Sequence, residues 1–117
     1  MSDKAKNNVE WLQDFYRRLC DSDWEHAYGF DISTLDNPGW KVAFNLTDTK
    51  LSRCDFNNIE LNRTDDNWIF CEVKEDIFLG RGGTHNLDEL LGIFRNWVEQ
   101  NLPDTESPWL PELDDSE

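Results

Sequence analysis

The order of apolar and polar residues along the chain predicts a helix near each end. Between about residues 8 and 20, one face repeats with the helical spacing i, i+3, i+4, i+7 through Leu12, Phe15, Tyr16 and Leu19. Asn7 and Glu10 stand where a capping box would begin this helix. A second apolar stripe, capped by Asn86 with Glu89 three residues later, continues to about Leu102 through Leu87, Leu90, Leu91, Phe94, Trp97 and Val98.

Between the helices the apolar period changes to two, which is typical of strands that bury one face. Alternating runs at 28–32 and 40–46 flank Asn37-Pro38-Gly39, whose Pro and Gly are the residues that a type II turn requires. Further strands are expected over 56–61, 68–73 and 77–79. This order predicts one α+β domain over residues 1–102, in which four or five antiparallel strands carry both helices on one face.

Acidic residues dominate the charge of the chain, which has 117 residues, 25 of them acidic and 11 basic, and a formal net charge of -14. Such a charge repels nucleic acid and anionic membranes and attracts basic partners; keeping the protein soluble is the alternative role. Residues 103–117 contain acids and no base. We expect them to form a flexible tail, with docking of Trp109 and Leu110 on the domain as the alternative.

The sequence predicts neither a cofactor site nor a membrane-spanning segment. Cys20, Cys54 and Cys71 are far apart and form no CxxC pair, so we expect buried or inert thiols, no disulfide framework, no zinc and no other cofactor. The chain starts without an apolar signal segment, and no apolar run is long enough to span a membrane. We therefore expect a cytoplasmic protein.

The densest group of candidate functional side chains follows the first helix, at residues 21–26. Asp23, Glu25 and His26 could bind a metal or act as acid and base, but no second histidine or cysteine stands nearby at a ligand spacing. Turn, capping or surface-recognition roles are the favoured interpretation. Trp24 is expected to pack in the core beneath the helix end.

A glycine-rich segment, Gly80-Arg81-Gly82-Gly83, is predicted to join the last strand to the second helix. Backbone N–H groups at such a junction can bind an anion. The segment nevertheless lacks the Lys-Ser/Thr of a P-loop and the full GxGxxG spacing. We favour glycines that adopt a positive φ at a sharp corner, which leaves Arg81 exposed.

Several segments together resemble the immunity protein 53 family of bacterial polymorphic toxin systems. They are Trp11-Leu12-Gln13-Asp14-Phe15-Tyr16, Cys20-Asp21-Ser22-Asp23-Trp24-Glu25-His26, Tyr28-Gly29, Thr34-Leu35-Asp36-Asn37-Pro38-Gly39-Trp40, Gly80-Arg81-Gly82-Gly83 and Asn86-Leu87-Asp88-Glu89-Leu90-Leu91 with Phe94 and Trp97. The resemblance extends over about residues 8–102. It leads us to expect a glycine between two aspartates where this chain has Ser22.

The resemblance implies a non-catalytic immunity protein, an antitoxin that binds a toxin domain and blocks its active site or a neighbouring surface. The acidic charge favours a basic toxin such as a nuclease. The candidate partner-binding residues are Asp21, Asp23, Trp24, Glu25, His26, Asp36 and Arg81. Two alternatives are a small metal- or anion-binding enzyme that uses Asp23, Glu25, His26 and Arg81, and an acidic DNA-mimic regulator.

Overall fold

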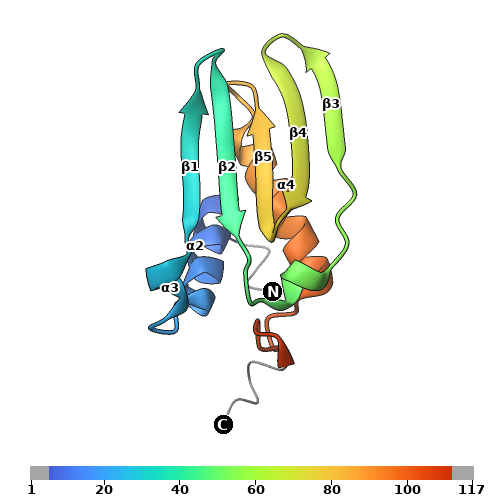
Figure 1. Ribbon diagram of the computed structural model, residues 1–117. Coiled ribbons are helices and arrows are strands. Elements are labelled where there is room, and N and C mark those ends of the chain that lie inside the picture. Colours follow the sequence, from blue (N-terminus) through green and yellow to red (C-terminus); the bar gives the residue numbers. More distant parts are fainter. Residues whose placement is uncertain (1–5, 112–117) are drawn as a thin grey trace.

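The computed structural model describes residues 6–111 and shows a five-stranded sheet with two long helices on one face (Figure 1). Helices α2 (Asn8–Leu19) and α4 (Leu87–Asn101) lie behind the sheet in this view, and the short helix α3 (Trp24–Ala27) follows α2. The remaining elements are β1 (Phe30–Leu35), β2 (Gly39–Asn45), the 3-10 helix η1 (Lys50–Arg53), β3 (Ile59–Thr64), β4 (Asn67–Lys74) and β5 (Ile77–Gly82). The predicted α+β class is confirmed. Residues 112–117 of the predicted tail lie outside the described residues.

The strands are arranged in the order β1-β2-β5-β4-β3, and every neighbouring pair is antiparallel. The last strand in the sequence, β5, therefore lies at the centre of the sheet, while β1 and β3 form its edges. Because side chains alternate between the two faces of a strand, each strand contributes one set to the helices and the other set to the opposite face.

The core lies between the sheet and the two helices. Phe44 of β2 and Phe78 of β5 are fully buried beneath Phe94 of α4, with ring centroids 4.7 Å and 4.9 Å from that of Phe94. From α2, Trp11 and Phe15 add edge contacts to the same ring. Aromatic pairs of this kind each contribute about 0.5–1.5 kcal/mol beyond their area burial, so this cluster fixes the helices on the sheet.

The two helix starts differ in how closely they match the prediction. The capping box is confirmed: Asn7 Oδ1 accepts a hydrogen bond from the Glu10 N–H at 2.8 Å, and Glu10 Oε1 accepts one from the Asn7 N–H at 3.2 Å. At α4, Asn86 is the N-cap residue but its side chain does not cap the helix. Its Oδ1 instead accepts hydrogen bonds from the backbone N–H groups of Trp68 and Gly83, which ties the helix start to β4.

The predicted reason for the glycines is wrong at both turns, because no glycine within residues 6–111 has a positive φ. A type II turn needs one at its third residue, so the loop of residues 36–38 between β1 and β2 is not of that type. Gly39 lies inside β2, where a Cβ atom would stand 2.3 Å from the carbonyl oxygen of Gly82. A Cβ atom on Gly83 would stand 2.1 Å from the carbonyl oxygen of Asp66. Close backbone approach therefore requires these glycines.

Several strand boundaries also differ from the prediction, and β1 covers Phe30–Leu35 where 28–32 was expected. The third strand begins at Ile59, and Phe56 instead packs on Phe78 and Trp97, with centroids 5.4 Å and 5.3 Å away. The last strand continues through Arg81 to Gly82, where it pairs with both β2 and β4. Among residues 6–111, no helix is long and apolar enough to cross a membrane.

Candidate functional site

The residues between α2 and α3 form a tight corner that is held by its own carboxylates. Asp21 Oδ1 accepts hydrogen bonds from the backbone N–H groups of Trp24 (2.8 Å) and Asp23 (2.9 Å). The Glu25 carboxylate accepts hydrogen bonds from the backbone N–H groups of Asp21 (2.9 Å) and Ser22 (3.0 Å). The bonds from Trp24 and Asp23 lower the pKa of Asp21 from its ordinary value. Asp21 and Glu25 therefore act as turn and capping residues.

Ser22 occupies the strained position of this corner. Its φ is 86°, in the left-handed region that a glycine adopts without strain and a serine does not. The backbone thus has the conformation for which the family resemblance led us to expect a glycine. The two hydrogen bonds that the Asp21 carboxylate accepts and the two that the Glu25 carboxylate accepts hold the chain in this shape despite the serine.

Trp24 fills the space beneath the corner, as predicted. Its side chain is only 3% exposed, and its ring lies 5.8 Å from that of Phe30 and 6.2 Å from those of Tyr16 and Tyr28. The indole N–H has no hydrogen-bond partner in the described part of the chain. Trp24 therefore contributes packing to the fold, and only part of its surface lines the neighbouring pocket.

A segment from the C-terminal part of the chain forms the other wall beside this corner. The Lys50 N–H donates a hydrogen bond to the Pro108 carbonyl at 2.8 Å, and the Leu110 N–H donates one to the Asp48 carbonyl at 3.2 Å. Trp109 pairs with the buried Thr49 between them. This short antiparallel pairing places Trp109 and Asp48 next to the corner, so the first part of the predicted tail contacts the domain.

A pocket of about 370 Å³ lies between the corner and this segment. We call it the acidic pocket, and its lining residues are Asp21, Asp23, Trp24, Ala27, Tyr28, Asp48 and Trp109. Its three carboxylates form no ion pair with any residue in the range 6–111. Carboxylates beside aromatic rings are the surroundings that a guanidinium or ammonium group prefers. The acidic pocket can therefore bind a cationic side chain.

The structure does not gather the remaining predicted residues at this pocket. His26 is exposed at the end of α3, and Asp36 lies in the loop beyond the far end of β1. Arg81 lies on β5, two strands away from β1. Arg81 is therefore not brought to Asp23, Glu25 and His26. Within the described residues, no group of three or more His, Cys, Asp or Glu side chains could hold a metal ion.

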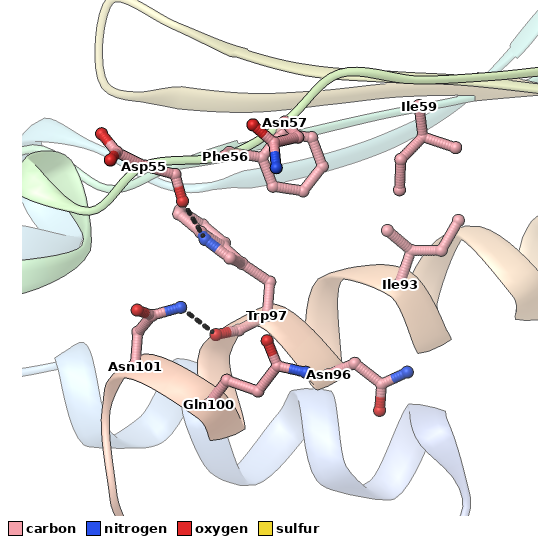
Figure 2. Close-up of a pocket in the computed structure, with 9 residues that line it drawn as sticks. All are labelled: Asp55, Phe56, Asn57, Ile59, Ile93, Asn96, Trp97, Gln100 and Asn101. Carbon is pink, nitrogen blue, oxygen red and sulfur yellow. Dashed lines mark hydrogen bonds between the residues drawn. The ribbon is translucent and has the colours of Figure 1, made fainter.

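A second pocket, of about 410 Å³, lies between residues 55–59 and the C-terminal half of α4 (Figure 2). The Trp97 indole N–H donates a hydrogen bond to the Asp55 carbonyl at 2.9 Å and holds this segment on the helix. The side-chain amides of Asn57, Asn96 and Gln100 line this pocket. Asp55 is the single ionisable residue of its lining, so this pocket contains no acid–base pair.

The face of the sheet opposite α2 and α4 carries no element of residues 6–111 (Figure 1). The strand register places a row of side chains across it from edge to edge: Ser33, Lys41, Arg81, Phe70 and Glu60. Lys41 and Arg81 stand directly opposite each other, and both are half-buried. Like charges in this arrangement destabilise a strand pair. We call Lys41 and Arg81 the cationic pair.

Three residues of these surfaces were missed by sequence reasoning. Asp48 joins the acidic pocket through a loop in which its φ is 73°, a conformation that Asp and Asn tolerate better than most residues. Tyr28 lies at the end of α3, two residues beyond the segment 21–26. Lys41 meets Arg81 only through the β2–β5 pairing, which joins strands far apart in the sequence. No local signal marks Asp48 or Lys41.

Burial affects two of the three cysteine thiols, Cys54 and Cys71. Burial raises the pKa of the Cys71 thiol to about 12, so it stays protonated at neutral pH, and burial also raises the pKa of Cys54. Cys20 is exposed, contrary to the part of the prediction that expected buried thiols. All three are free cysteines.

Comparison with known proteins identifies a family. The family model described as immunity protein 53 matches residues 9–99, which include every helix and strand except the ends of α2 and α4. No curated protein and no solved structure matches the chain. Because the family model covers far more than half of the sequence, the chain belongs to the immunity protein 53 family.

Proposed function

We propose that this protein binds a cognate toxin domain of basic charge, such as a nuclease, and neutralises it without catalysis in the cytoplasm of the cell that it protects. Membership of the immunity protein 53 family supports the immunity role. The acidic pocket carries the proposal of a basic partner, because its three carboxylates have no ion-pair partner among the described residues.

The carboxylates at and beside the acidic pocket have two different roles. Asp21 and Glu25 hold the corner through backbone hydrogen bonds, whereas Asp23 and Asp48 are available to a lysine or arginine of the toxin. The net charge of -14 attracts a basic domain from a distance and raises the rate of encounter. The bound toxin would then be blocked at its active site or beside it.

The direct test uses a cognate toxin domain, which is first sought in the genes beside this one. The purified toxin domain is assayed with increasing amounts of the protein, and complex formation is measured by calorimetry. We expect inhibition that is complete near one protein per toxin domain. A toxin that keeps full activity in excess protein, with no heat of binding, contradicts the proposal.

The contribution of the acidic pocket is tested with Asp23→Asn combined with Asp48→Asn. Asparagine tolerates the positive φ of residue 48, so the change removes charge and keeps the backbone. We expect association with the toxin to slow by roughly three- to tenfold at low salt and the difference to vanish at high salt. Asp21 and Glu25 are left intact because their loss would disrupt the corner.

A matched control removes two charges elsewhere. Asp65→Asn combined with Asp66→Asn changes the turn between β3 and β4 by the same net charge. We expect this control to alter association much less than the pocket variant. Equal association rates for the two variants would show that net charge alone, and not the acidic pocket, attracts the toxin.

A further inference from the structure

The cationic pair is an exception on an acidic protein. Neither Lys41 nor Arg81 forms an ion pair with any residue of the described range, although the chain has more than twice as many acids as bases. The two side chains lie side by side on the adjacent inner strands β2 and β5, where their mutual repulsion weakens the strand pairing. No carboxylate of the described residues offsets this repulsion.

Apolar side chains surround the cationic pair on the same face. The register places Phe70 directly opposite Arg81 on β4, with Trp68 two residues earlier and Leu79 two residues before Arg81 on β5. All three are half-buried although no element of residues 6–111 covers them. Interface hot spots are enriched in Trp and Arg and lie near the centre of a contact surface. Arg81 occupies the central strand of the sheet.

We propose that the uncovered face of the sheet is the surface on which the toxin domain docks, and that Lys41 and Arg81 together bind one carboxylate of the toxin. This proposal rests on the proposed function and adds the docking face and the chemistry of its recognition. A carboxylate accepts hydrogen bonds from the Arg81 guanidinium and the Lys41 ammonium and removes their repulsion. The apolar side chains around them exclude water from the contact.

The other charged residues of this face leave the cationic pair available to a carboxylate of the partner. They are Asp31, Glu60, Glu72 and Lys74, and none of them forms an ion pair with the cationic pair. Asp31 and Glu60 lie on the edge strands, where they would form the rim of the contact. A toxin residue that enters the centre therefore meets two positive charges, while the rim and the rest of the protein repel an acidic surface.

A second copy of the chain is the less favourable occupant of this face. Two copies would each bring a net charge of -14 and would repel each other at long range. A basic toxin with one central carboxylate is attracted by the whole protein and then held by the cationic pair. The acidic pocket and net charge thus govern the association rate, and the cationic pair governs the dissociation rate.

The experiment measures dissociation of the same cognate toxin domain. We expect Lys41→Ala combined with Arg81→Ala to raise the dissociation rate roughly ten- to hundredfold and to change the association rate little. The fold is verified by circular dichroism and thermal unfolding. The single variant Arg81→Ala is compared with Arg17→Ala as its charge-matched control, because Arg17 is exposed on α2 away from this face, and we expect Arg17→Ala to change the dissociation rate by less than about threefold.

A charge exchange identifies the carboxylate itself. Arg81→Glu is combined with single Asp→Arg and Glu→Arg changes in the toxin, and one of them is expected to restore tight binding. If the wild-type protein binds the toxin and the double alanine variant dissociates at the wild-type rate, the docking face is wrong while the proposed function stands. If the variant instead reduces self-association in light scattering, a second copy occupies the face and the proposal is overturned. Failure of the wild-type protein to bind overturns both.

Discussion

The acidic corner and the uncovered sheet face present charge in two different ways. In the corner, Asp21 and Glu25 accept backbone hydrogen bonds, so their charges also fix the path of the chain. On the sheet face, Lys41 and Arg81 are positioned by strand register and form no ion pair with any residue in the range 6–111. The comparison shows that a charged side chain can be structural in one place and free for recognition in another. The hydrogen-bond partners distinguish the two cases, and the residue type does not.

The same contrast applies to the two tryptophans beside these charges. Trp24 is buried in the corner among three aromatic rings, whereas Trp68 lies half-buried on the uncovered face. Trp24 was included among the candidate partner-binding residues on the basis of its acidic neighbours. Its burial assigns it chiefly to the core, whereas Trp68 is half-buried on the proposed docking face.

The largest expected effect is therefore on the stability of the corner. Trp24→Ala should lower the free energy of unfolding by about 3–5 kcal/mol, since it removes a buried aromatic side chain and leaves a cavity. Trp68→Ala is the matched control and should cost about 1–2 kcal/mol, because Trp68 is only half-buried. Urea unfolding measures both values. Equal losses for the two variants would contradict the division between core and surface.

Two neighbouring residues of β4 allow the same comparison between core and uncovered face within one strand. Ile69 is 1% exposed and faces the helices, while Phe70 faces the uncovered side. Ile69→Ala should lower the free energy of unfolding by about 2–4 kcal/mol. Phe70→Ala should cost about 1 kcal/mol or less, yet it should raise the dissociation rate of the toxin domain about tenfold.

The readouts for this pair are urea unfolding and toxin dissociation followed by biolayer interferometry. Ile69→Ala that still folds should release the toxin at the wild-type rate, because its side chain does not reach the uncovered face. The docking face would lose its support if Phe70→Ala destabilised the protein as much as Ile69→Ala, or if it left toxin dissociation unchanged.

The parts of the fold that depend on local pattern could be predicted from the sequence. The stripe from Leu12 to Leu19 and the capping pair Asn7 and Glu10 lie within a few residues of each other, and the structure confirms both. The role of the glycines could not be predicted in this way. Gly39 is required by the carbonyl of Gly82 on the adjacent strand, and sequence spacing does not show which strands are adjacent.

The residues of the candidate surfaces also differ in whether the local sequence could predict them. The acidic residues Asp21, Asp23 and Glu25 could be found because they lie within five residues of each other in the sequence. Asp48 and Trp109 complete the acidic pocket through a pairing between residues about 60 positions apart, and Lys41 meets Arg81 through the β2–β5 register. These juxtapositions depend on the order of the strands, which alternation of apolar residues alone does not determine.

The smallest expected effect is at Ser22, where the corner stores strain. A non-glycine residue in the left-handed region costs about 1–2 kcal/mol, and glycine loses about 0.5–1 kcal/mol more entropy on folding. Ser22→Gly should therefore raise the free energy of unfolding by roughly 0.5–1 kcal/mol in urea unfolding. Ser22→Ala keeps the strain and should give no gain. Because Asp21 and Glu25 remain in place in both variants, the association rate with the toxin should stay unchanged. If Ser22→Ala raised the free energy of unfolding as much as Ser22→Gly, the serine side chain, and not the backbone conformation, would be the source of the destabilisation.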